Sequence, residues 1–235
     1  MAQKDNTITA SFGSGRGNTL NIDLNYSETS SMHIDNFMLT DKVNAKDETK
    51  CFDTTKPAEL TIYVEQSIEG SRKLTANIGH TFVGIKQEGI VRNLGFYPDS
   101  PRATLLANQD SEIHDNSGSK FHISITVSIT ASQLKKAIKA INGYPSKYDL
   151  NNYNCTDFGI EVAKKSGLDL PKTVGKYGIF FKGNNPSDLG EDIREMSDNG
   201  YIIINEPLWT ESAIVSFATE SHSSIKSEPS SLGLR

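Results

Sequence analysis

The sequence contains no apolar stretch long enough to cross a membrane and no excess of basic residues. Its longest aliphatic runs, such as Ile202-Ile203-Ile204, fall far short of the roughly 20 residues that a membrane-spanning helix needs. Its 24 Lys and Arg residues are outnumbered by 29 Asp and Glu residues, which gives a net charge of −5. Because binding to phosphates needs a basic surplus, we expect no nucleic-acid partner.

Cysteine is also scarce, since Cys51 and Cys155 are the only two and lie far apart. The absence of a CxxC pair excludes a zinc ribbon and a thioredoxin motif. The first residues, Met-Ala-Gln-Lys-Asp-Asn-Thr, lack the apolar stretch of a secretory signal peptide. We therefore expect synthesis in the cytoplasm with both thiols reduced. Histidine and cysteine are too scattered for a local metal motif, and no residue pattern indicates a metal or organic cofactor.

The chain is long and apolar enough to fold, with 235 residues of which 36% are hydrophobic and 23% charged. We predict one domain over residues 1–210. Its first part, about residues 1–58, is a polar β extension that includes the alternating segment 19–26. Residues 211–235 are rich in serine, which predicts a mobile tail.

Alternating and β-branched segments predict strands in the middle of the chain. Residues 60–64 form one such segment, and residues 81–85 and 90–96 flank a turn at 86–89, as in a hairpin. Residues 108–119 are polar and predict a long loop. In residues 121–129 every odd position is apolar and every even position polar, which is typical of a strand with one buried face.

Helix signals follow these strands. Thr130 and Gln133 fit a capping box before residues with helical apolar spacing, and Gly143 ends that helix. A second helix should run from about Asn154 to Ser166, a third should begin near Ser187, and residues 201–204 predict a last strand. Because the helices mostly follow the strands, the fold class is α+β.

Cys155 stands at the predicted start of the second helix, where unpaired N–H groups and the helix dipole favour a thiolate. A small residue chosen for packing against a sheet explains this cysteine equally well. A thiol nucleophile also needs a base. Of the histidines at positions 33, 80, 114, 122 and 222, His114 and His222 should be solvated, and His80 opens a strand.

The segments Gly79-His80-Thr81-Phe82-Val83-Gly84 and Tyr153-Asn154-Cys155-Thr156-Asp157-Phe158 together resemble the circularly permuted branch of the NlpC/P60 papain-like superfamily. Its best-known members are the lecithin:retinol acyltransferase-like proteins. In that branch the histidine strand precedes the cysteine helix, and an Asn-Cys pair opens that helix. The stretch from Tyr148 to Cys155, with residues 186–189 behind it, also resembles papain-like domains of bacterial effectors. The resemblance covers about residues 60–195 and implies a papain-like antiparallel sheet packed on the Cys155 helix.

The resemblance implies acyl transfer, with Cys155 as the nucleophile and His80 as the base. The family's third polar residue usually follows on the next strand, which places it at Arg92 or Asn93. An imidazole N–H needs an acceptor, and arginine offers none, so we expect Asn93, with His122 as the substitute. Many relatives have a second histidine in this hairpin, and this chain has none there.

For the substrate, the resemblance implies a peptide amide, above all in peptidoglycan stem peptides. It also implies export by a contact-dependent secretion system, with an immunity or delivery protein as a further partner. One alternative is a lipid acyltransferase or thioesterase of the permuted branch. Another is a non-catalytic binding module on the same scaffold, which an unpaired Cys155 and His80 would favour. Of the two cysteines, we expect Cys155 to be the reactive thiol and Cys51 the inert one.

Overall fold

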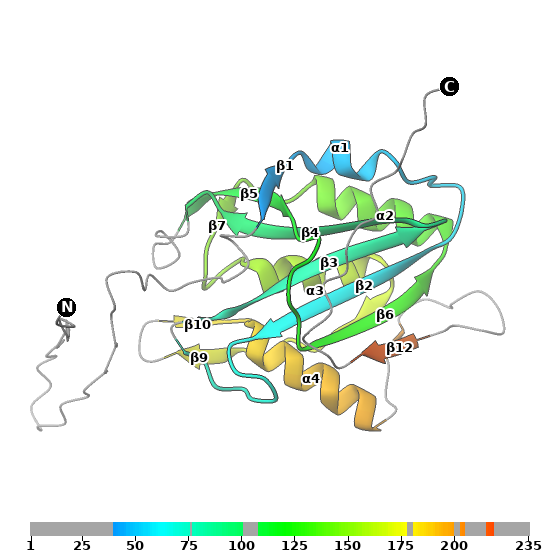
Figure 1. Ribbon diagram of the computed structural model, residues 1–235. Helices are drawn as coiled ribbons and strands as arrows, with labels where there is room; N and C mark the ends of the chain where they lie inside the picture. Colours follow the sequence, from blue (N-terminus) through cyan, green and yellow to red (C-terminus); the bar gives the residue numbers. More distant parts are fainter. Residues whose placement is uncertain are drawn as a thin grey trace, which may run out of the picture.

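The computed structural model describes residues 40–75, 77–100, 108–177, 181–199, 203–204 and 215–218. Its centre is an eight-stranded antiparallel sheet with the order β1-β5-β4-β3-β2-β6-β12, in which β7 also pairs with β5 (Figure 1). These strands are β1 (Asp41–Val43), β2 (Ala58–Gln66), β3 (Gly79–Gln87), β4 (Ile90–Pro98), β5 (Gln109–Asp115), β6 (Ile123–Ile129), β7 (Lys147–Tyr148) and β12 (Val215–Ala218). The sheet is open, and its central strands β2, β3 and β4 are largely buried.

Four helices and two small antiparallel strand pairs accompany the sheet in the described part of the chain. The helices are α1 (Ala45–Thr49), α2 (Ala131–Asn142), α3 (Cys155–Lys165) and α4 (Pro186–Asn199). The pairs are β9 (Gly175–Tyr177) with β10 (Phe181–Gly183), and β8 (Leu168–Asp169) with β11 (Ile203–Ile204). None of the helices described is long and apolar enough to span a membrane. The architecture is therefore α+β, as the sequence predicts.

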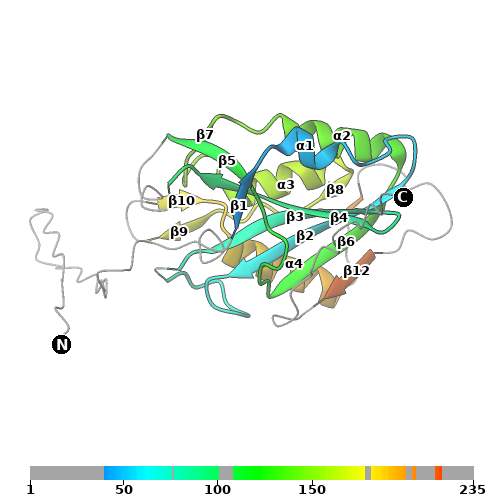
Figure 2. The same cartoon turned by 45° about the horizontal axis from the view of Figure 1, so that its top comes forward.

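The two faces of the sheet are covered by different parts of the chain. Val83 and Ile85 of β3 lie in the main core together with Phe158 of α3 and Leu189 of α4, so these helices pack on one face. On the other face, the connection between β5 and β6 crosses in front of β3 and β2 (Figures 1 and 2). Since side chains alternate along a strand, neighbouring residues of β3 enter different surroundings.

Several local predictions are confirmed. The apolar positions of β6 are all buried, and Thr130 caps the start of α2 with both hydrogen bonds of the capping box. The hairpin of β3 and β4 turns tightly at Glu88 and Gly89, both of which have positive φ. A non-glycine side chain at Gly89 would be strained in that conformation, which explains the glycine.

Other segments differ from expectation. The polar loop predicted over residues 108–119 is wrong, because Gln109–Asp115 forms β5 between β4 and β1. Its single apolar residue, Ile113, enters the core, and this is too little alternation to reveal a strand in the sequence. Residues 215–218 lie in the stretch expected to be a mobile tail, yet they pair with β6 as β12. The segment 19–26 lies outside the described residues.

Candidate functional site

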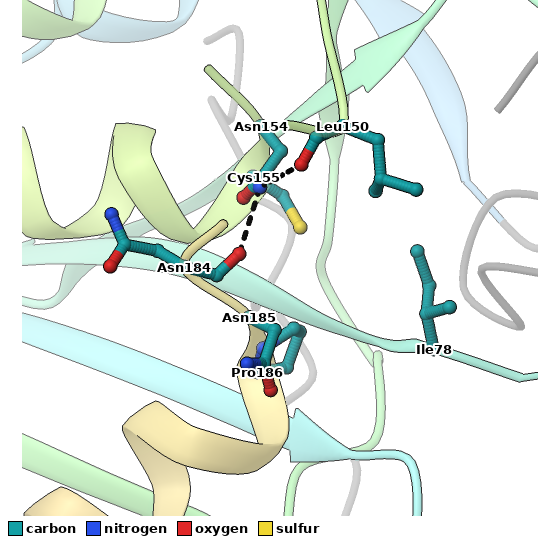
Figure 3. Close-up of a pocket in the computed structure, with 7 residues that line it drawn as sticks. All are labelled: Ile78, Leu150, Asn154, Cys155, Asn184, Asn185 and Pro186. Atoms are coloured by element: carbon teal, nitrogen blue, oxygen red, sulfur yellow. Dashed lines mark hydrogen bonds between the residues drawn. The ribbon is translucent and has the colours of Figure 1, made fainter. Parts of the chain in front are cut away.

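Cys155 is the first residue of α3, and the residue before it holds the helix start in place. The side-chain oxygen of Asn154 accepts hydrogen bonds from the backbone N–H groups of Thr156 (2.8 Å) and Asp157 (3.4 Å). The Asp157 carboxylate accepts in return from the Asn154 N–H at 3.2 Å, which completes a capping box. The Asn154 amide also donates to the carbonyls of Leu150 and Asn184, both at 2.9 Å, as Figure 3 shows. The chain around the cysteine is thereby fixed on three sides.

A small cavity lies beside the sulfur. It is lined by Cys155 and Asn154 together with Ile78, Leu150, Asn184, Asn185 and Pro186 (Figure 3). It offers about 10 Å³ to the centre of a water molecule, which is near the least that one water needs. The side chains of Asn154 and Asn185 are already engaged, the latter with Asp188. In this structure the cavity is therefore too small for a substrate group beyond the size of a water or methyl.

The thiol is protonated in this environment. Cys155 is only 1% exposed, and burial raises its pKa above the ordinary value. The backbone of Thr81 and the phenol of Tyr148 lie next to the sulfur and lower the pKa, but by less than burial raises it. This corrects the expectation of an easily ionised thiol, because desolvation outweighs the helix start.

His80 lies on β3, fully buried on the face away from α3. Its ring stacks against that of Tyr97 with centroids 4.2 Å apart, and Phe82 is 6.1 Å away on the same side. Gly95 of β4 makes room for it, since an added Cβ would stand 2.6 Å from His80 Nε2 and would clash with Asn116 Oδ1. Burial lowers the pKa of His80 to about 3, with a smaller contribution from His114, so the imidazole is neutral.

The structure does not join His80 to Cys155 by a hydrogen bond. Neither ring nitrogen of His80 has a hydrogen-bond partner among the described residues. The next residue, Thr81, points toward α3 instead, where its hydroxyl lies 3.3 Å from that of Thr156. The alternation of side chains along β3 thus sends His80 to one face of the sheet and leaves Cys155 on the other.

The expected third residue is not brought to His80 either. Asn93 is buried and lies opposite Gly84, four residues along β3 from His80, or roughly 13 Å at the rise of a strand. His122 precedes β6, on the far side of β2, and its Nδ1 accepts the Gln66 N–H at 2.9 Å. Asn116 is the polar side chain that shares the space above Gly95 with His80.

Sequence reasoning missed this cluster around His80. His114 is buried, in contrast to the expected solvated position, and its ring lies 4.5 Å from that of Tyr97. Its nitrogens lie 2.9 Å from Thr40 Oγ1 and 2.8 Å from Glu112 Oε1. The one available signal was the alternation in Glu112-Ile113-His114, which is too short to stand out among polar residues.

Comparison with known proteins gives no identification. No family model matches the chain, and no curated protein and no solved structure is significantly similar to it.

Proposed function

We propose that this protein is a thiol-dependent hydrolase of peptide amides, with Cys155 as its nucleophile. The observation that carries the proposal is the placement of the Cys155 sulfur at the capped first turn of α3, beside a cavity. The Cys155 N–H is at the helix start, where no intrahelical acceptor exists, and it can donate to an oxyanion formed next to the sulfur. A cysteine at a helix start, with N–H groups that can hold an oxyanion, supports acyl transfer, and the cavity beside it must widen to admit a substrate carbonyl.

The chemistry has two steps. The sulfur attacks the carbonyl carbon of the amide, its proton passes to the base, and the base protonates the departing amine. Water then attacks the thioester, which releases the carboxylic acid and restores the thiol. His80 is the proposed base. In the described structure it lies on the face of β3 away from Cys155, so this role requires a rearrangement of β3 that brings the imidazole to the sulfur.

The substrate we propose is the stem peptide of peptidoglycan. Wild-type protein should release peptide fragments from isolated sacculi, and Cys155→Ala should abolish that release. Cys51→Ala is the matched control, because Cys51 lies away from the cavity, with its thiol donating to the Glu48 carbonyl. Thermal unfolding of both variants verifies their folding. Turnover of a thioester or phospholipid that depends on Cys155, with sacculi intact, would move the assignment to a lipid acyltransferase or thioesterase.

A non-catalytic binding module is the second candidate. The observation that favours it is the separation of His80 and Cys155 onto the two faces of the sheet. Under this alternative, neither sacculi nor acyl esters are turned over, and Cys155→Ala binds isolated sacculi as well as the wild type in a pull-down. The binding module would be excluded if the wild type turns over either substrate and Cys155→Ala does not.

A further inference from the structure

The connection between β5 and β6 spans the sheet face that carries His80. We call residues 116–122 the crossover segment. Since β4, β3 and β2 lie between β5 and β6 in the sheet, this segment must pass over all three strands, and Figures 1 and 2 show it doing so.

Hydrogen bonds fix the crossover segment at both ends. At its start, the Asn116 N–H donates to the Asn93 carbonyl at 2.8 Å. The Asn116 side-chain amide donates to the Tyr97 hydroxyl at 2.7 Å and to Ser119 Oγ at 3.0 Å. At its end, the His122 N–H donates to the Val64 carbonyl at 2.8 Å. Phe121 also packs edge-on against Tyr63, with ring centroids 5.0 Å apart.

Polar groups where the crossover segment meets the sheet lack hydrogen-bond partners. Both ring nitrogens of His80 and the side-chain oxygen of Asn116 are buried and make no hydrogen bond with the described residues. Most buried polar groups in proteins are paired, and water would pair these if the segment lifted. The closed arrangement therefore carries a penalty that opening relieves.

We infer that the crossover segment is a latch over His80, held shut by Asn116, and that it must open before water or a solute can reach His80. In the closed form His80 faces Glu65 on β2 and Tyr97 on β4, with Glu112 and His114 of β5 beyond. Burial dominates over these groups and keeps the imidazole neutral and a very weak base. Opening to water returns the pKa of His80 toward its ordinary value, because the desolvation is relieved. The latch rests on this geometry and not on the proposed hydrolase function.

Carbethoxylation of histidines by diethyl pyrocarbonate, mapped by mass spectrometry, tests the latch. His80 should react slowly in the wild type, and Asn116→Ala should raise its rate by about tenfold, because local opening governs access to buried groups. Ser117→Ala is the matched control, since Ser117 is a neighbour whose bond to Asp115 is made by the backbone N–H. Iodoacetamide labelling of Cys155, on the other face of the sheet, reports any general loosening of the fold, and its rate should not change.

Ser119→Ala removes one hydrogen bond of the latch, the one from the Asn116 amide. It serves as a milder variant if Asn116→Ala does not fold.

The latch would be overturned if His80 is carbethoxylated at the wild-type rate in both Asn116→Ala and Ser119→Ala. Equal acceleration of His80 and Cys155 would also overturn it, because that pattern means loosening of the whole fold. The outcome is separable from the hydrolase proposal. An inactive protein whose His80 responds to Asn116→Ala keeps the latch and loses the hydrolase, and an active protein whose His80 does not respond shows the reverse.

Discussion

At the scale of single residues, His80 is the most unusual group in the described structure. A histidine with two unpaired nitrogens, surrounded by the rings of Phe82 and Tyr97, can be buried only as the neutral form. The side-chain oxygen of the neighbouring Asn116 is also buried without a hydrogen-bond partner among the described residues. Burial therefore keeps the imidazole unprotonated well below its ordinary pKa of about 6.5.

This depressed pKa predicts how stability changes with pH. The folded state binds the proton of His80 only near pH 3, and the unfolded state binds it near 6.5. The histidine's contribution is therefore fully present above pH 6.5 and is lost as the pH falls toward 3, at about 1.4 kcal/mol per pH unit. Urea unfolding at pH 7.5, 5.5 and 4.5 should show this slope in the wild type and a shallower one in His80→Gln. Parallel profiles for the two proteins would show that His80 is not buried as described.

At the scale of elements, the start of α3 joins three segments of the chain. Asn154 caps the helix and also ties it to the Leu150 carbonyl and to the Asn184 carbonyl next to α4. The capping function was predictable from the spacing of Asn154 and Asp157 alone. The two further bonds were not, because they depend on where residues 150 and 184 arrive in the fold.

Removal of this cap should both destabilise the protein and expose the thiol. Asn154→Ala leaves N–H groups of the first turn and two carbonyls unpaired, which should cost about 1–2 kcal/mol in urea unfolding. Iodoacetamide should then modify Cys155 faster, relative to Cys51 as the reference within the same chain. Asn44→Ala is the control, because Asn44 caps the short helix α1 in an exposed position. Its stability loss should be smaller, and its Cys155 rate should equal that of the wild type; a faster rate would refute the account of the cavity.

At the scale of the whole molecule, the sequence predicts the α+β class, the β3–β4 hairpin, strand β6 and the helices that carry Thr130 and Asn154 at their starts. These are local features, written in alternation and capping residues. Which strands become neighbours in the sheet, and which residues meet across them, is not a local feature of the sequence. The placement of β5 next to β4 and the crossover over β3 decide that His80 meets Asn116 and Tyr97.

The same distinction explains the candidate site. A histidine at a strand start and a cysteine at a helix start were both found where the sequence puts them. The face that His80 enters depends on its position in β3, where side chains alternate, and a shift of one residue would turn it toward α3 and Cys155. Short motifs do not carry that information, so the dyad stays a proposal that chemistry must test.

The most direct measurement is the detection of a covalent intermediate. Wild-type protein incubated with sacculi and quenched in acid should carry an acyl group on the peptide that contains Cys155, seen by mass spectrometry and removed by hydroxylamine as a thioester. Cys155→Ala should carry none, and Cys51 should remain free in both. Release of peptides from sacculi without any adduct on Cys155, or with the adduct on Cys51, would contradict the assignment of Cys155 as the nucleophile.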